Sequence, residues 1–274
     1  VMASGLATTS SSGTLARPGK IAATFAELRA KGKRAFVPYI TAGDPGIEET
    51  VDLLKGLEDA GADVIEVGVP FSDPMADGPV IQASSQRALD RGVRLDAVLD
   101  MVSRSSVRAP IVLFSYLNPI LAAGPDVLDR AAQAGCHGLL LTDLPVGSDP
   151  AREAWLGGGP LAFIRLVAPT TPAERMREIG THGSGFVYLI SRLGVTGVQQ
   201  ALAADLPESM ARLRAATTLP ICVGFGVSTA EQATAVAKLA DGVVVGSAIV
   251  RAANESVASA VSFARDMRRA IDAA

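Results

Sequence analysis

Cysteine and histidine are both scarce in this chain of 274 residues, which holds two of each. Cys136 and Cys222 stand among apolar or small neighbours. We therefore expect two buried thiols in a reducing compartment rather than a disulfide.

Long apolar runs and blocks of like charge are also missing from the sequence. No uninterrupted apolar run is long enough to span a bilayer, so we expect a soluble protein. The formal net charge is only -3, with no cluster of one sign. Nucleic acid and anionic membrane surfaces are therefore not expected as partners.

The stretch at 1–20 differs from the rest of the chain in composition. It is rich in Ser, Thr and Ala, lacks acidic residues, and has no apolar segment of the kind found in secretory signals. We predict a flexible tail, which is either simply disordered or an organelle transit peptide with Arg17 and Lys20 as its only basic residues. The expected location is the cytoplasm, or the plastid stroma if the tail is a transit remnant.

From Ile21 onward, short apolar runs alternate with longer amphipathic stretches. The pattern predicts a leading helix at about 21–32 and strands near 36–42, 63–68, 111–117, 138–143, 161–168, 186–191, 220–225 and 242–247. Helices are predicted near 48–60, 79–90, 95–104, 125–134, 149–156, 172–179, 206–215, 229–239 and 255–272.

The predicted strands are apolar on both faces, as at 111–114, which is typical of parallel strands covered on both sides. Eight βα units in a chain of this length predict the α/β class and a single (β/α)8 TIM barrel over 21–274, with an extra N-terminal helix. A doubly wound open sheet is the alternative, but the turn at 41–46 lacks the glycine-rich dinucleotide fingerprint. In a barrel, functional residues lie on the loops that follow the strands.

The second predicted strand and the loop after it carry three carboxylates. If Val64, Glu66 and Gly68 face the interior, Glu66 is an acid in an apolar pore. Loss of hydration there raises the pKa of a carboxyl and suits it to general acid–base catalysis; the alternative is a buried acid with a structural role. The loop adds Asp73 and Asp77, and each of these could instead be a turn former or a helix N-cap.

Glycines at the ends of two adjacent strands predict an anion site. They lie in 223–228 and 245–248, where backbone amides can approach a phosphate and a short helix could add its positive N-terminal end. The loop at 191–197 also holds two glycines. It is either a mobile lid over a ligand or an ordinary surface connection.

Lysines and histidines are missing from the predicted active end. The lysines lie before the first strand or on helices, which argues against a Schiff-base aldolase. His137 and His182 fall on the opposite face, which argues against a histidine-bound metal and a Ser–His–acid triad. Carboxylate acid–base chemistry on a phosphorylated substrate remains.

Five segments of the chain resemble the tryptophan synthase alpha subunit, and they are 36–45, 66–79, 191–197, 223–228 and 246–250. The likeness runs from about Phe25 to the C-terminus. It implies a lyase of tryptophan biosynthesis that splits indole-3-glycerol phosphate into indole and glyceraldehyde 3-phosphate by a retro-aldol reaction. It also implies no metal or cofactor in this chain, and an α2β2 heterotetramer with a beta subunit that carries pyridoxal phosphate.

The resemblance assigns roles to individual residues. Glu66 would be the catalytic acid–base, and Asp77 would hold the indole N–H. Substrate would contact Phe36, Tyr39, Thr41, Tyr116, Tyr188 and the lid residue Thr196. Phosphate would bind to backbone groups at Gly197, Gly226, Gly246 and Ser247. Asp73 is the candidate contact with the partner subunit.

Three alternatives stay open from the sequence. The chain could be another phosphate-binding barrel of amino-acid biosynthesis, although the lack of lysine at the strand ends argues against a synthase that forms indole-3-glycerol phosphate. It could be a stand-alone lyase that releases indole. It could also act mainly as an allosteric activator of a beta subunit.

Overall fold

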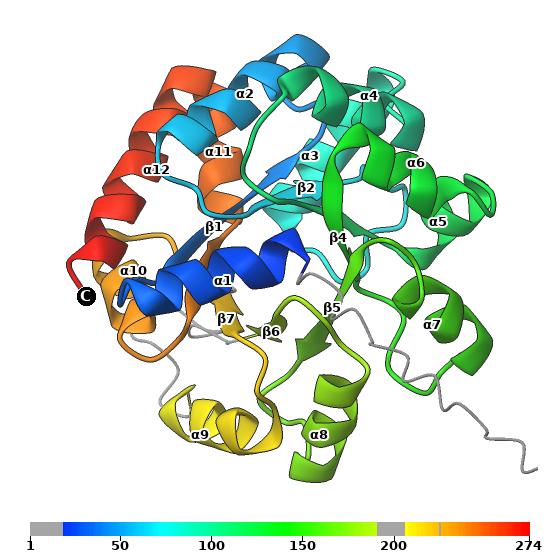
Figure 1. Cartoon of the computed structure of the whole chain (residues 1–274). Helices are drawn as coiled ribbons and strands as arrows, with labels where there is room; N and C mark the ends of the chain where they lie inside the picture. The colour runs from blue at the N-terminus through cyan, green and yellow to red at the C-terminus, as the bar shows by residue number, and fades with distance from the viewer. Residues whose placement is uncertain (1–18, 191–205, 225) are drawn as a thin grey trace, which may run out of the picture.

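A computed structural model describes residues 19–190, 206–224 and 226–274 (Figure 1). Its strands are parallel and close into a barrel in chain order, with β8 paired to β1, which confirms the predicted (β/α)8 barrel. The strands are β1 (Ala35–Thr41), β2 (Ile65–Gly68), β3 (Ile111–Ser115), β4 (Cys136–Leu141), β5 (Ala162–Val167), β6 (Val187–Ile190), β7 (Ile221–Gly224) and β8 (Gly242–Val245).

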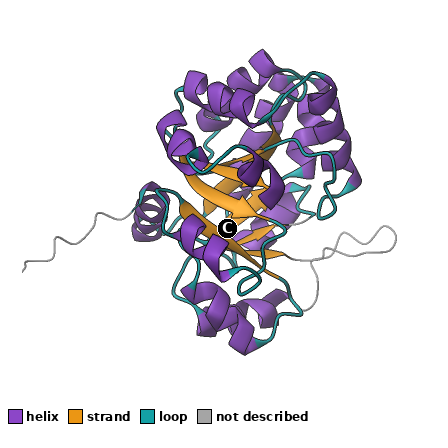
Figure 2. Ribbon diagram, turned by 90° about the vertical axis from the view of Figure 1, so that its right-hand side faces the viewer, coloured by secondary structure: helices purple, strands orange, loops and turns teal. Residues whose placement is uncertain are grey.

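Helices form a ring around the barrel, as the turned view in Figure 2 also shows. They are α1 (Lys20–Ala30), α2 (Ile47–Asp59), α3 (Pro79–Asp90), α4 (Leu95–Ser105), α5 (Leu117–Ala122), α6 (Val127–Ala134), α7 (Pro150–Gly157), α8 (Ala173–Thr181), α9 (Leu206–Ala216), α10 (Ala230–Ala237), α11 (Ser247–Glu255) and α12 (Val257–Asp272). None of the helices in the described ranges has the length and apolar character needed to cross a bilayer.

The predicted N-terminal helix is present as α1, which lies across one opening of the barrel (Figure 1). Ile21 and Phe25 of this helix are buried and pack against residues of the barrel interior. The tail predicted at 1–20 lies outside the described residues except for Gly19 and Lys20, and Lys20 already belongs to α1. Helix α5 was not predicted, because its six residues are too few to show a helical period.

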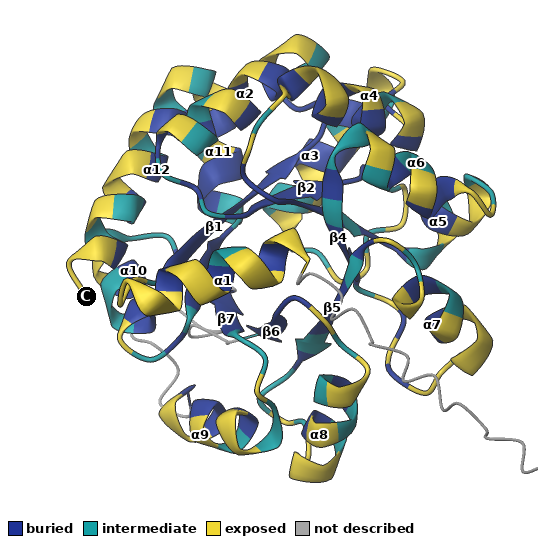
Figure 3. Cartoon of the chain, in the orientation of Figure 1, coloured by how far each residue is buried: buried dark blue, intermediate teal, exposed yellow. Residues whose placement is uncertain are grey.

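Strand residues divide into two apolar layers by simple alternation. Val64, directly before β2, faces the barrel interior, whereas Ile65 and Val67 of β2 pack between the sheet and the helices. Figure 3 shows the buried colour on the strands and on the helix surfaces that face them. Burial of each large apolar side chain contributes about 1.5–3 kcal/mol, so both layers stabilise the barrel. The two cysteines, Cys136 and Cys222, are buried free thiols, as expected.

The loop at 69–78, which carries Asp73 and Asp77 and is here named the acidic loop, joins β2 to helix α3 and ends where that helix begins. Pro79 occupies the first helical turn, where its ring favours the helical φ and its missing N–H costs nothing. Arg87 of α3 donates to both carboxylate oxygens of Asp44, at 2.8 and 2.7 Å. Asp44 is buried in the loop after β1, so this ion pair ties α3 to the end of that strand.

Candidate active site

Glu66 lies inside the barrel, so the side of the strand that it shares with Val64 is the interior one. Glu66 pairs in register with Tyr39 of β1, and its side chain is only 1% exposed. The oxygen Oε1 of Glu66 is buried and has no hydrogen-bond partner among the described residues. Burial raises the pKa of this carboxyl to about 8, so it keeps its proton at neutral pH. A neutral acid in this place can donate a proton to a bound substrate.

Two buried tyrosines lie near Glu66, one from β1 and one from β6. Burial raises the pKa of Tyr39 and of Tyr188 above the ordinary value, and the charge of Glu66 adds to both effects. The ring of Tyr188 lies so close to β7 that a Cβ added to Gly224 would be 2.3 Å from its hydroxyl oxygen. Gly224 therefore makes room for a tyrosine ring, a use of this glycine that the sequence did not indicate.

Asp77 is bound by the hydroxyl group of Tyr116. This hydroxyl donates to Oδ2 of Asp77 at 3.0 Å and accepts from the amide of Ala76 at 2.9 Å. Burial raises the pKa of Asp77 to about 6, while the hydrogen bond from Tyr116 acts in the opposite direction. The ring of Phe71 packs on that of Tyr116 with centroids 5.0 Å apart. The acidic loop is thus fixed to the end of β3.

Phe114 of β3 is a site residue that the sequence analysis missed. Its ring meets that of Tyr39 edge-on, with centroids 5.2 Å apart and an interplanar angle of 78°. The same alternation that places Val112 inside the barrel also directs Phe114 inward, so the signal was present in the sequence. Aromatic walls of this kind suit a flat ring.

Thr41 is at the end of β1, but its hydroxyl group is turned to a neighbouring helix. Its Oγ1 lies 2.7 Å from Oγ of Ser84 on α3, and both residues are buried. The charge-free hydrogen bond joins the strand end to the helix that follows the acidic loop. Thr41 therefore helps to position the site as well as lying at its edge.

Phe36 does not belong to the site, and its prediction as a substrate contact is wrong. It pairs with Val243 near the start of β1 and packs in the outer layer between sheet and helices. Alternation explains the error, because position 36 faces the opposite side from Tyr39. The resemblance matched a string of residues without regard to the side on which each one lies.

Gly246 and Ser247 lie at the N-terminus of α11, where no side chain caps the helix. The amides of residues 247–249 donate no hydrogen bond to any of the described residues, so these groups are available to an anion. At α10, by contrast, the amide of Gln232 already donates to Oγ1 of the N-cap residue Thr229, at 3.3 Å. A Cβ added to Gly246 would be 3.7 Å from Cβ of Tyr39, which links this helix end to the barrel interior.

Gly226 and Gly197 were also expected at the phosphate site, and Thr196 was expected to contact the substrate. Gly226 is exposed beyond β7 and has a φ of 89°, a conformation that favours glycine. Thr196 and Gly197 lie outside the described residues. The structure therefore brings only part of the predicted set together.

Asp73 lies exposed on the acidic loop. Oγ of Ser72 donates to its carboxylate at 2.6 Å, and the amide of Met75 donates to its backbone carbonyl at 2.9 Å. These local bonds fit a turn former. The neighbouring Met75 is 89% exposed, which is unusual for a large apolar side chain.

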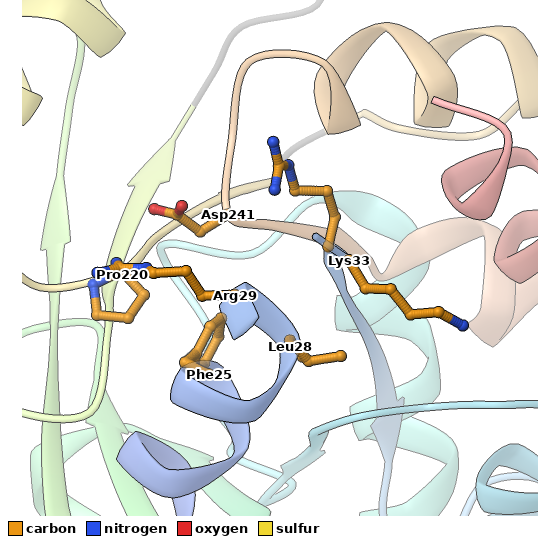
Figure 4. A pocket seen from close by; sticks show the side chains of 7 residues that line it. Phe25, Leu28, Arg29, Lys33, Pro220 and Asp241 are labelled. Carbon is orange, nitrogen blue, oxygen red and sulfur yellow. The ribbon is translucent and has the colours of Figure 1, made fainter. Parts of the chain in front are cut away.

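Two cavities lie away from these residues. Figure 4 shows the first, beside α1, lined by Phe25, Leu28, Arg29, Lys33, Pro220 and Asp241 among others. Its volume of about 20 Å³ has room for little more than one water molecule. The second is an outer groove of about 490 Å³ between α3 and α11. Within the described ranges, no group of three His, Cys, Asp or Glu side chains could hold a metal ion.

Comparison with known proteins gives a consistent result. A sequence profile of the family described as tryptophan synthase alpha chain matches residues 25–272. The tryptophan synthase alpha chain of Gloeobacter violaceus is 48% identical over 266 residues, which cover 94% of this chain and 96% of that relative. That of Citrifermentans bemidjiense is 49% identical over 239 residues, or 85% of this chain and 88% of the relative.

Solved structures agree with the sequence relatives. The crystal structure of tryptophan synthase subunit alpha from Legionella pneumophila superposes with a TM-score of 0.84 at 39% identity, covering 93% of this chain and 99% of that one. A structure of Mycobacterium tuberculosis tryptophan synthase gives a TM-score of 0.86 at 34% identity, with the same coverage of 93% and 99%. The barrel, its buried glutamate and these matches over nearly the whole length show that the chain belongs to the tryptophan synthase alpha chain family.

Proposed function

We propose that this chain cleaves indole-3-glycerol phosphate to indole and glyceraldehyde 3-phosphate. The observation that supports this most is the contrast between two carboxyl groups of the site. The pKa of Glu66 is raised to about 8 and that of Asp77 to about 6. Near pH 7, Glu66 is therefore mostly neutral and Asp77 mostly ionised. The first can donate a proton, and the second can stabilise a positive charge.

In the proposed reaction Glu66 acts twice. As a neutral acid it protonates C3 of the indole ring, which leaves an electron-poor indolenine and a Glu66 carboxylate. Asp77 holds the ring N–H and stabilises the positive charge that develops there. The Glu66 carboxylate then removes the proton of the glycerol hydroxyl as the C–C bond breaks, and the bonding electrons return to the ring. The aldehyde and indole leave, and Glu66 is neutral again.

The rest of the site supplies binding and orientation. Tyr39 and Phe114 offer aromatic surfaces to the indole ring. The free amides at the start of α11 offer donors to the phosphate, and this remote binding energy positions the reacting bond. We propose that this chain needs no cofactor and that pyridoxal phosphate belongs to a beta subunit, as the family resemblance implies.

We also propose an α2β2 complex with a beta subunit, in which the exposed part of the acidic loop forms a contact. Asp73 supplies a charge there, and Met75 supplies an apolar side chain that is almost fully exposed. An exposed apolar residue beside a charged one is typical of a surface that a partner covers. The stand-alone lyase and the mainly regulatory subunit are the other outcomes of the test.

The experiment is an assay of indole release from indole-3-glycerol phosphate by the purified chain, with and without a beta subunit from a relative. We expect slow release by the chain alone and faster release with the partner. Equal rates would favour a stand-alone lyase. Absence of indole under both conditions would contradict the proposed function.

A further inference from the structure

Helix α5 begins directly after Tyr116, and a carboxylate from another loop binds its first amide. The N-cap residue Tyr116 makes no side-chain cap. Instead, Oδ1 of Asp143 accepts from the amide of Leu117 at 2.8 Å. Asp143 lies two residues beyond β4, so this bond crosses from one strand end to the next. Charge-assisted bonds of this kind are stronger than neutral ones.

Asp143 binds the backbone amide next to Tyr116, and the side chain of Tyr116 binds Asp77. The hydroxyl of Tyr116 is the only side-chain group among the described residues that donates to the Asp77 carboxylate. Two further hydrogen bonds hold this part of the acidic loop. The backbone amide of Ala76 donates to the hydroxyl of Tyr116, and the side-chain amide of Gln82 donates to the backbone carbonyl of Asp77 at 2.9 Å. A displacement of the backbone at Leu117 would therefore move the ring of Tyr116, and with it the hydrogen bond to the Asp77 carboxylate.

A buried ion pair, Arg165 with Glu153, holds the loop that carries Asp143. The next residue, Leu144, accepts from Nη1 of Arg165 at 3.2 Å through its backbone carbonyl. Arg165 also pairs with Glu153 at 2.8 Å, and both side chains are buried. Oε1 of Glu153 accepts from the amide of Gly147 at 2.7 Å. The loop that carries Asp143 is thus hydrogen-bonded to this ion pair at two positions, Leu144 and Gly147.

We propose that Asp143 is a positioning residue for Asp77, acting through the amide of Leu117 and the hydroxyl of Tyr116. The role of Asp77 in the reaction rests on the proposed function, whereas the positioning of its carboxyl does not. Among the described groups, the charge of Asp77 raises the pKa of the phenols Tyr39, Tyr116 and Tyr188. Of these, Tyr116 alone is hydrogen-bonded to it and lowers the pKa of its carboxyl.

The first test compares variants of Asp143 in the full-length chain with a beta subunit present. Asp143→Ala should lower kcat roughly 10-fold or more, because a misplaced catalytic group is slow, with little change in KM. Asp143→Asn keeps an acceptor oxygen and should stay within about threefold of the wild type. Asp143→Glu keeps the charge but moves the acceptor, so it should resemble the alanine variant. The matched control is Asp129→Ala, because the exposed carboxylate of Asp129 makes no hydrogen bond to any of the described residues.

A double variant separates positioning from general stability. If Asp143 acts through Tyr116, Asp143→Ala combined with Tyr116→Phe should be no slower than Tyr116→Phe alone, within about twofold. Additive losses would overturn the proposal. So would an asparagine variant as slow as the alanine variant, because charge rather than the hydrogen bond would then be responsible.

The second test needs no substrate and therefore does not depend on the proposed reaction. The Asp77 carboxyl is titrated by carbon-13 NMR in the unliganded chain. We expect its pKa to rise in both Asp143→Ala and Tyr116→Phe, since each loses the hydrogen bond that favours the carboxylate. An unchanged Asp77 titration in Asp143→Ala would overturn the positioning role, even if the wild-type chain releases indole. A shifted titration without indole release would leave positioning intact and contradict the reaction.

Discussion

The hydroxyl oxygen of Tyr39 lies where a side chain on Gly68 would begin. A Cβ added to Gly68 would be 2.0 Å from that oxygen and 2.6 Å from the ring carbon that bears it. The two residues come from adjacent strands, and Gly68 pairs in register with Thr41, two residues beyond Tyr39. The tyrosine ring thus leans across the next strand and fills the space that the glycine leaves. Tyr188 and Gly224 repeat this arrangement on β6 and β7.

Replacing Gly68 by alanine should displace the ring of Tyr39 and disturb the site. Overpacking a core usually costs about 1–3 kcal/mol of stability, and here the ring that moves lies beside Glu66. We expect a lower melting temperature and a kcat reduced by roughly 10-fold or more. Thermal unfolding and the indole assay measure the two effects. Gly157→Ala is the control for stability, because this glycine is exposed and a Cβ there would make only one ordinary contact, with the ring of Phe163 at 3.9 Å. A Gly68→Ala chain with normal turnover would show that the ring position is unimportant.

Glu66→Gln should leave the fold intact and remove most of the activity. The amide keeps the size of the side chain but cannot transfer a proton, so turnover should fall by about 10² or more. Circular dichroism checks the fold, and the indole assay checks turnover. A variant that retains near-normal turnover would exclude Glu66 as the acid–base group.

The same variant should change how stability depends on pH. Between the ordinary pKa of 4.5 and about 8, the folded chain holds a proton on Glu66 that the unfolded chain has released. Stability from this group is therefore full below pH 4.5 and falls as pH rises through about 8, with a slope of up to about 1.4 kcal/mol per pH unit. Glu66→Gln removes this loss, so its advantage over the wild type in urea unfolding should grow from pH 5 to about pH 8 and level off above. A constant difference would mean that Glu66 is ionised when folded.

How much the sequence revealed differs between Glu66 and its neighbours. Alternation along one strand put Glu66 on the same side as Val64 and Gly68, and the structure shows that this side is the interior one. The same rule places Phe114 on the interior side with Val112, and Phe36 on the side opposite to Tyr39. Alternation within a strand is a local property, and it can be derived from a single chain.

Contacts between strands could not be derived in this way. The bond from Tyr116 to Asp77 joins residues 39 positions apart, and its geometry depends on how the acidic loop folds back. The bond from Asp143 to Leu117 depends in turn on a six-residue helix with no visible period. Such details follow from barrel closure and side-chain reach, which spacing in the sequence does not specify.

The rate of indole formation should depend on pH through both carboxyl groups. Asp77 must be ionised, so activity should rise as pH increases through about 6. Glu66 must be protonated, so activity should fall as pH increases through about 8. The expected kcat/KM profile of the free enzyme is a bell with its maximum near neutral pH. In Asp77→Asn the rate should be much lower and the acid limb should vanish; an acid limb that persists would belong to another group.

A bulky residue at position 246 should weaken phosphate binding more than it affects the fold. Gly246 precedes the free amides of α11, and its added Cβ alone would make only ordinary contacts, the nearest at 3.7 Å. Gly246→Ala should therefore be mild, whereas Gly246→Leu should raise KM roughly 10-fold, because the side chain occupies the approach to the amides. Steady-state kinetics with indole-3-glycerol phosphate measures this. Equal KM values in the two variants would place the phosphate elsewhere.

Removing one partner of the buried pair Arg165 and Glu153 should lower the free energy of unfolding much more than replacing both by apolar residues. Both side chains are less than one-tenth exposed, and Glu153 accepts from Arg165 at 2.8 Å as well as from the loop amide of Gly147. Glu153→Leu leaves a buried guanidinium without its partner and should cost about 3–5 kcal/mol in urea unfolding. Glu153→Leu combined with Arg165→Met should recover much of that loss, because no unpaired charge remains. The double variant should still be slow in the indole assay, since the loop that carries Asp143 has lost its anchor at Leu144. Full activity together with recovered stability would show that the loop needs no such anchor.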